Sequence, residues 1–196
     1  MSVDKVTQNI SKVIALGSQG KEFLQSILKP VSYKRKSVVL HAGDVCLYEM
    51  YVVKGCLKIF YTDPEGATHT VKFAVEDWWA FDIESFTLQT PAFYTIQALE
   101  DTDVLQISKV HHDQLYARFP VFEKFGRVQF QNSYILLQRR MTQHLFSSAD
   151  ERYAHFREKY PGLELRIPQK EIASYLGITP EFLSMIRHKA AKDTFS

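Results

Sequence analysis

The chain has 196 residues, of which 45% are hydrophobic and 23% are charged. This composition is typical of a globular protein with a hydrophobic core and argues against a disordered or fibrous chain. The net charge of +2 is too small to indicate nucleic-acid binding by itself. Basic residues are mildly enriched toward the end, where residues 139–196 carry 10 Lys and Arg against 7 Asp and Glu.

Location and redox chemistry follow from what the sequence lacks. Residues 1–20 have scattered charges, and no later window is apolar enough for a membrane span. We therefore expect a cytoplasmic protein without a signal peptide that does not bind a membrane. Cys46 and Cys56 are too few for a structural zinc site or an iron–sulfur cluster, so we expect two buried thiols and no metal.

Near residue 30 the sequence pattern changes from helical spacing to strand-like alternation. Residues 3–16 and 20–28 have the spacing of short amphipathic helices, whereas residues 31–79 show the short alternating runs of antiparallel strands. The stretch 63–66 (DPEG) predicts a hairpin turn, and Gly43 and Gly55 predict tight corners. Further along we expect a short helix at 80–86 and strands at 94–98 and 104–107.

A helical region is predicted from Ser108 to Phe146, with a break at residues 119–120 (Phe-Pro). In its second part, a set of residues recurs at spacings of four and three positions, as in the seam of a coiled coil. Such a seam favours pairing with a second copy of the chain, and packing on the chain's own β domain is the alternative. The seam consists of Val121, Phe125, Val128, Asn132, Ile135, Arg139, Thr142 and Phe146, and the five from Phe125 to Arg139 are the predicted dimer contacts.

The last third begins with a capping box at residues 148–151, which opens a helix running to Tyr160. Pro161 and Gly162 end this helix. Residues 163–167 predict one short strand.

Two short helices joined by a tight turn are predicted over Pro168–Lys189. Gly177 can end the first helix in the left-handed conformation, and Thr179 can cap the second. Leu183 and Ile186 point inward and leave a polar and basic outer face. This is the pattern of a DNA-binding helix-turn-helix, and an ordinary helical hairpin is the alternative.

The order of parts resembles the Crp/Fnr family of bacterial transcription regulators over nearly the whole chain. The stretches that carry the resemblance are 41–44 (HAGD), 51–55 (YVVKG), 63–66, 100–108 and 168–189. The resemblance implies an α+β fold, with a jelly-roll-like antiparallel β-roll sensor domain at 1–119, a long dimerisation helix at 120–147 and a helix-turn-helix domain at 148–196. It also implies a homodimer that binds double-stranded DNA, contacts RNA polymerase and senses a small molecule. The short ending, which lacks a full wing, is similar to that of family members from Bacteroidetes-type bacteria.

The family's cyclic-nucleotide binders have a Gly-Glu pair before the short helix and an Arg-Ser pair after its loop, which hold the ribose and the phosphate. Here Ala80-Phe81 and Ala92-Phe93 stand at those places, and no Arg or Lys lies between residues 72 and 109. A buried cyclic phosphate would lack its cation, so we expect no binding of cyclic AMP.

Aromatic residues dominate this cassette instead. Any effector bound there is expected to be apolar or cationic, and the alternative is that the rings fill the pocket and leave no site. The predicted pocket residues are Trp78, Trp79, Phe81, Asp82, Glu84, Phe93 and Tyr94, with Leu137 and Gln138 from the long helix.

The base-reading positions implied by the resemblance are Pro180, Glu181 and Met185. Glu181 can accept a hydrogen bond from cytosine, but Pro180 and Met185 stand where the family often has arginine, the usual reader of guanine. We therefore predict weak or altered specificity. The other predicted DNA contacts are Gln169, Thr179, Ser184, Arg187, His188 and Lys189.

Two rival functions remain. A cupin-like enzyme needs a metal held by two histidines spaced by one residue, which the isolated His41 and His69 do not provide, so we expect no enzyme. The other rival is a degenerate family member that acts through protein contacts without reading DNA. Its support is the apolar pair Phe182 and Met185 on the second helix.

Overall fold

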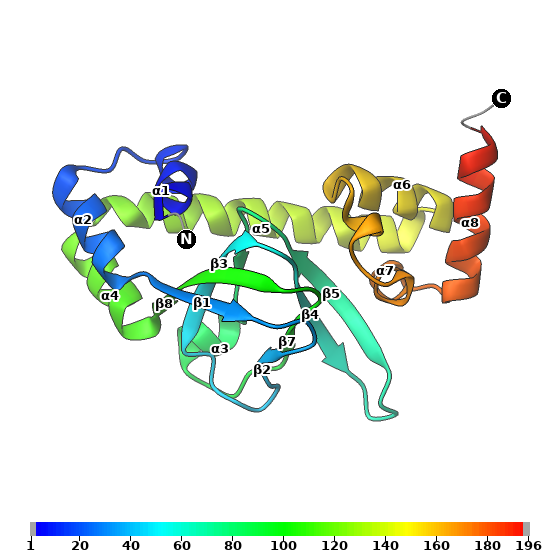
Figure 1. The fold of residues 1–196 in the computed structure, drawn as a ribbon, viewed down its shortest axis with the longest axis horizontal. Coiled ribbons are helices and arrows are strands. Elements are labelled where there is room, and N and C mark those ends of the chain that lie inside the picture. The colour runs from blue at the N-terminus through cyan, green and yellow to red at the C-terminus, as the bar shows by residue number, and fades with distance from the viewer. Residues whose placement is uncertain (1–2, 194–196) are drawn as a thin grey trace.

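The structure is a computed structural model that describes residues 3–193. Two four-stranded antiparallel sheets form a β-roll at its centre (Figure 1), which confirms the predicted β domain. One sheet has the order β1-β8-β3-β6 and the other the order β2-β7-β4-β5. The strands are β1 (Lys29–Tyr33), β2 (Val38–Leu40), β3 (Tyr48–Lys54), β4 (Leu57–Thr62), β5 (Thr68–Ala74), β6 (Trp79–Ala80), β7 (Thr95–Ala98) and β8 (Thr102–Ser108).

Glycines shape the strand connections at the predicted corners. Gly66 (φ 86°) closes the β4–β5 hairpin, where its amide donates to Asp63 O at 3.0 Å. Gly55 (φ 102°) joins β3 to β4 and lies so close to Thr102 that a Cβ would approach the threonine backbone at 2.7 Å. Both corners therefore require a residue without a side chain.

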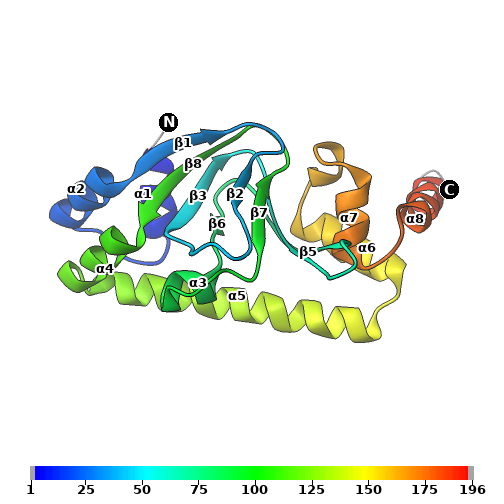
Figure 2. The same ribbon diagram turned by 90° about the horizontal axis from the view of Figure 1, so that it is seen from below.

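Helices flank the roll at both ends and along one side (Figures 1 and 2). The longest, α5, has 26 residues and so a length of about 39 Å. None of the helices in residues 3–193 has the length and apolar character needed to cross a membrane. The helices are α1 (Val3–Ser11), α2 (Ser18–Ile27), α3 (Ile83–Leu88), α4 (Lys109–Arg118), α5 (Val121–Phe146), α6 (Ala149–Lys159), the 3-10 helix η1 (Leu163–Leu165), α7 (Gln169–Leu176) and α8 (Pro180–Asp193).

One local prediction has shifted bounds and another was wrong. The short helix α3 begins at Ile83, because residues 79–80 pair with β3 as strand β6 and Asp82 caps the helix. The stretch 163–167 is not a strand. It contains η1, because Leu163 and Ile167, one helical turn apart, are both buried among the C-terminal helices.

Three clusters of buried side chains hold the molecule together. The first fills the space between the sheets and includes Val52, Leu57 and Ile96. The second lies on the other face of β3 and β8, beneath the N-terminal helices that the sequence predicted to cover the roll. The third joins the roll to the C-terminal helices, with Phe73 of β5 packed against Phe156 of α6. This third cluster joins residues of the predicted sensor domain to residues of the predicted helix-turn-helix domain. The domain boundaries therefore stay a prediction.

The two cysteines are buried and unpaired, as predicted. Cys46 and Cys56 lie in the connections on either side of β3 rather than within strands. Burial raises the pKa of both thiols, so they stay protonated at neutral pH.

Candidate functional site

Helices α7 and α8 meet at the turn that the sequence predicts. Gly177 has the left-handed conformation (φ 67°), and its amide donates to carbonyl groups of the last turn of α7. Thr179 Oγ1 accepts from the Phe182 amide at 3.2 Å and so caps α8. Leu183 and Ile186 are buried, which turns the opposite face of α8 outward. The predicted helix–turn–helix geometry is thus confirmed.

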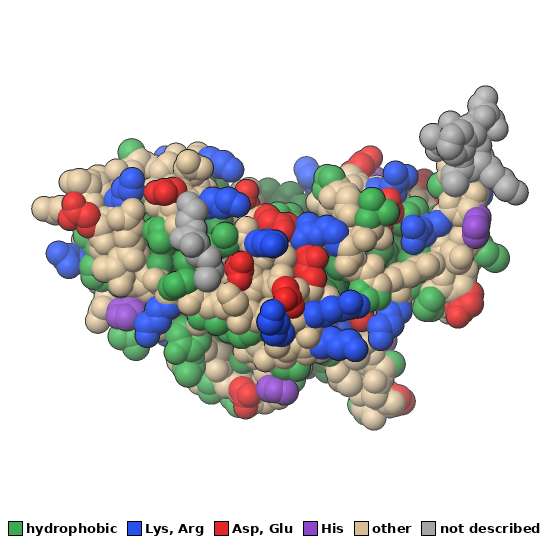
Figure 3. All heavy atoms as spheres, viewed as in Figure 1, with side chains coloured by type: hydrophobic (Ala, Val, Ile, Leu, Met, Phe, Trp, Pro, Cys, Tyr) green, Lys and Arg blue, Asp and Glu red, His purple; other side chains and the backbone are tan. Residues whose placement is uncertain are grey.

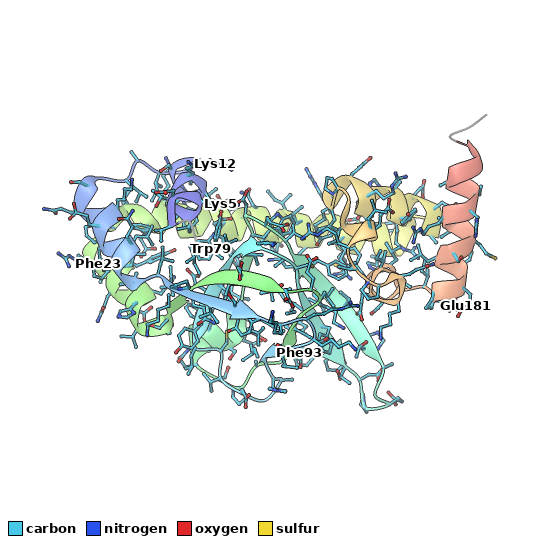
Figure 4. The ribbon with its side chains drawn as sticks, in the orientation of Figure 1. Lys5, Lys12, Phe23, Trp79, Phe93 and Glu181 are labelled. Carbon is cyan, nitrogen blue, oxygen red and sulfur yellow. The ribbon has the colours of Figure 1, made fainter. Side chains whose placement is uncertain are left out.

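The outward face of α8 carries most of the predicted DNA contacts. Met185 is 62% exposed, and Figure 4 shows Glu181 at the start of α8, at the end of the molecule remote from α1 and α2. Gln169 instead supports the turn, since its Nε2 donates to Pro180 O at 3.1 Å. Lys189 Nζ lies 3.6 Å from Asp150 of α6. Contact of any of these residues with DNA stays a prediction. Thr179, Pro180, Glu181, Met185, His188 and Lys189 are exposed, and Ser184 and Arg187 are half-buried.

The junction between the roll and the C-terminal helices is strongly polar. Figure 3 shows acidic and basic side chains interleaved across this part of the surface, rather than one basic patch. Arg166 Nη2 lies 2.7 Å from Glu76 Oε1 and also pairs with Glu100. Deeper in, Lys58 Nζ of β4 forms a buried ion pair with Glu171 Oε2 of α7 at 2.8 Å.

Helix α7 also docks on β5 through hydrogen bonds. Ser174 Oγ donates to Thr68 O at 2.7 Å and accepts from the Thr70 amide at 2.9 Å. Arg140 of α5 donates to Thr70 O at 2.9 Å and to Tyr175 O at 3.1 Å. The helix-turn-helix, the long helix and the β-roll are therefore linked at one place.

The cassette around α3 is closed to a phosphate by the chain's own carboxylate. Asp82 is buried, and its Oδ1 accepts from the Ser85 amide at 3.1 Å, which caps α3. Its Oδ2 accepts from the amides of Phe93 and Tyr94, both at 3.1 Å. These N–H groups would otherwise face an anionic ligand. The absence of cyclic nucleotide binding stays a prediction.

A cavity of about 670 Å³ lies between α5, α3 and the roll. Trp78, Trp79, Phe81 and Leu137 line it, as predicted for the effector pocket. Asp82 does not line the cavity, and its carboxylate instead caps α3. Phe93 stacks on Tyr61 with ring centres 4.7 Å apart, and Figure 4 shows it at the opposite edge of the roll from Trp79. The remaining predicted pocket residues, Glu84, Tyr94 and Gln138, also lie outside the cavity lining.

Sequence reasoning counted cations only within the cassette and so missed the four basic residues that line this cavity, Lys72, Arg127, Arg140 and Lys159. Lys72 Nζ lies 5.7 Å from the centre of the Trp78 ring, and Lys159 Nζ lies 5.8 Å from the same ring. Arg140 stacks on Tyr175 at 4.2 Å. Burial lowers the pKa of Lys72 to about 8. Burial, reinforced by the charges of Arg140 and Lys72, lowers the pKa of Lys159 to about 8.

The face of α5 that the sequence assigned to a dimer differs from its most exposed apolar face. Phe125 is only 6% exposed and packs on Trp79, so it belongs to the chain's own core. Val128 is half-buried, whereas Asn132, Ile135 and Arg139 are exposed. A separate apolar stripe, between 52% and 65% exposed, consists of Phe130, Tyr134, Leu137, Met141 and Leu145.

Known proteins share this architecture. Residues 30–119 match the family model described as cyclic nucleotide-binding domain. FixK2 of Bradyrhizobium japonicum superposes with a TM-score of 0.76 at 15% identity, covering 86% of this chain and 86% of FixK2. A CooA mutant from Carboxydothermus hydrogenoformans gives 0.67 at 20% identity, covering 85% of this chain and 78% of CooA.

The regulator CLP of Xanthomonas campestris gives a TM-score of 0.67 at 15% identity, covering 91% of this chain and 93% of CLP. Comparison with curated protein sequences gave no match. At these identities the likeness to solved structures shows the fold.

Proposed function

We propose that this chain is a transcription regulator that binds double-stranded DNA through α7 and α8. The premise is that it has the fold of the Crp/Fnr regulators and contains a cyclic nucleotide-binding-type domain. The observation that supports this most directly is the capped helix-turn-helix with an outward α8 face at the end of that fold. CLP, one of the proteins with this fold, is described as a global regulator responsive to c-di-GMP. On this proposal the protein works in the cytoplasm, and contact with RNA polymerase is part of the same expectation.

The proposed functional unit is a homodimer, because a two-fold symmetric DNA site needs two recognition helices. The exposed stripe of α5 supports this pairing, since its apolar residues recur at three- and four-residue steps along the helix. Leu137→Asp and Met141→Asp are expected to shift the protein to a monomer in sedimentation, because they place charges in the seam. Ile135→Asp is the matched control on another face of α5, and loss of the dimer with this variant alone would place the interface there.

The test of DNA recognition is a selection from random duplexes with the purified full-length chain. Enrichment of an inverted repeat is expected, and Met185→Ala should change the enriched sequence because Met185 lies on the outward face of α8. Lys124→Ala, an exposed change on α5, should leave the sequence unchanged. Failure to enrich any duplex at low salt would contradict the proposal and favour protein docking through Phe182 and Met185.

A further inference from the structure

The cavity beside α5 has an acidic end, where Arg127 lies one turn from Glu123, and a basic end. Glu123 lies in the first turn of α5, and Arg140 follows 17 positions later, near the end of the helix. This spacing separates them by about 25 Å. Glu49 lies near Glu123, and burial raises its pKa to about 8. The acidic end is thus separate from the end where Arg140 lies beside Lys72 and Lys159.

The basic end has no internal counter-charge. Among residues 3–193, none of Lys72, Arg140 and Lys159 forms an ion pair with a carboxylate. Lys72 Nζ donates to Trp79 O at 3.1 Å, and Lys159 Nζ donates to the Tyr175 hydroxyl at 3.4 Å. Since an ammonium group has three protons, each lysine keeps two donors for a ligand. These cations are half-buried, and gathering them in this way is costly until an anion joins them.

The wall next to these cations is aromatic. The centre of the Trp78 ring lies 5.7 Å from Lys72 Nζ and 5.8 Å from Lys159 Nζ. Trp79, Phe81, Phe86 and Phe130 also line the cavity. Rings of this kind bind a flat apolar body by stacking and by edge contacts. We propose that the cavity binds a small aromatic anion, with its carboxylate, sulfonate or phosphate group held by Lys72 and Lys159 beside Arg140.

The site has a regulatory consequence that rests on the proposed function. Its three cations come from three parts of the molecule: β5 belongs to the roll, α5 is the long helix, and α6 is one of the C-terminal helices. Arg140 and Lys159 also line a second hollow of about 410 Å³ between α5 and the helices α6 and α7. An anion bound here would hold all three parts together and favour the arrangement in which α7 lies on β5.

The probe for the test is anilinonaphthalenesulfonate, an aromatic anion, with neutral N-phenylnaphthylamine as the matched control ligand. The chain has two tryptophans, Trp78 and Trp79, and both line the cavity. Energy transfer from tryptophan to the probe therefore detects binding near the cavity, and the cavity variants assign the binding to it. We expect the sulfonate to bind at least about tenfold more tightly than the neutral ligand.

The matched variants are Lys72→Gln/Lys159→Gln in the cavity and Lys124→Gln on the exposed side of α5. The double variant is expected to lose the preference for the sulfonate while its melting temperature stays the same or rises, because like charges are removed. Lys124→Gln should bind as the unmodified chain does. Equal affinity for both ligands, or a preference that survives in the double variant, would overturn the proposal. DNA is absent from this experiment, so its failure and a failure of DNA binding are distinct results.

Discussion

The cassette at α3 and the junction at β5, α5 and α6 deal with charge in opposite ways. At the cassette, the buried carboxylate of Asp82 meets three backbone amides, so the positive end of α3 is satisfied within the chain. At the junction, Lys72 and Lys159 both lie near one indole ring, and no carboxylate of the described residues pairs with them. The fold of a cyclic nucleotide-binding domain therefore does not fix where an anion can bind. Individual side chains decide it.

The largest expected effect concerns Lys58, the buried cation between the roll and the C-terminal helices that has a carboxylate partner. Glu171→Ala leaves Lys58 buried without its partner, and we expect it to lower the free energy of unfolding by about 3–5 kcal/mol. Replacing both residues, as in Lys58→Met/Glu171→Leu, should restore most of this loss. Urea unfolding measures it. A loss below about 1 kcal/mol for Glu171→Ala would show that the pair is solvated and that the junction is looser than described.

Asp82 tests the cassette side of the comparison. Asp82→Ala removes the acceptor for the amides of Ser85, Phe93 and Tyr94, so we expect a loss of about 2–3 kcal/mol in the same unfolding experiment. Glu84→Ala is the matched control, because Glu84 is an exposed acid in the first turn of the same helix. Equal effects of the two variants would mean that the Asp82 bonds add no stability beyond a general helix-dipole effect.

A smaller effect should appear in the pH dependence of stability. Since the pKa values of Lys72 and Lys159 are lowered to about 8, the unfolded chain binds more protons than the folded one between pH 8 and the ordinary lysine pKa of 10.5. The cost of these charges is therefore fully present below pH 8 and disappears as the pH rises through that window. The groups that face the lysines are Arg140, Tyr160 and Tyr175.

The variant Lys72→Gln/Lys159→Gln isolates the lysines from those neighbours. It should exceed the unmodified chain in stability by on the order of 1 kcal/mol at pH 7, and the difference should shrink toward pH 10. Melting curves at several pH values check this trend. A difference that does not change with pH would show that the two ammonium groups are fully hydrated.

The parts that sequence reasoning predicted well depend on neighbouring residues. Gly177 and Thr179 set the turn between α7 and α8 through bonds within a few positions, and Gly66 closes its hairpin in the same way. The capping box at Ser148 and Glu151 is likewise local. Such signals survive without knowledge of the fold, because the atoms that satisfy them are close in sequence.

The parts that it missed depend on contacts between distant residues. Lys159 reaches Trp78 only because α6 packs against the roll, and spacing along the chain carries no trace of that contact. The seam on α5 shows the same limit. Residues spaced by three and four positions occur on more than one face of a long helix. Only the packing of the chain shows that Phe125 is already buried. The cations of the cavity were missed for the first reason, and the burial of Phe125 for the second.

The most direct test of the central claim, that α8 brings this chain to duplex DNA, is the salt dependence of binding to the selected duplex, measured by fluorescence anisotropy. Affinity should fall steeply and linearly on a logarithmic salt scale, and Lys189→Ala should reduce the slope by about 1 while Lys124→Ala leaves it unchanged. An affinity that does not change with salt concentration and is lost in Met185→Ser would contradict the claim, because it would show an apolar contact in place of phosphate recognition.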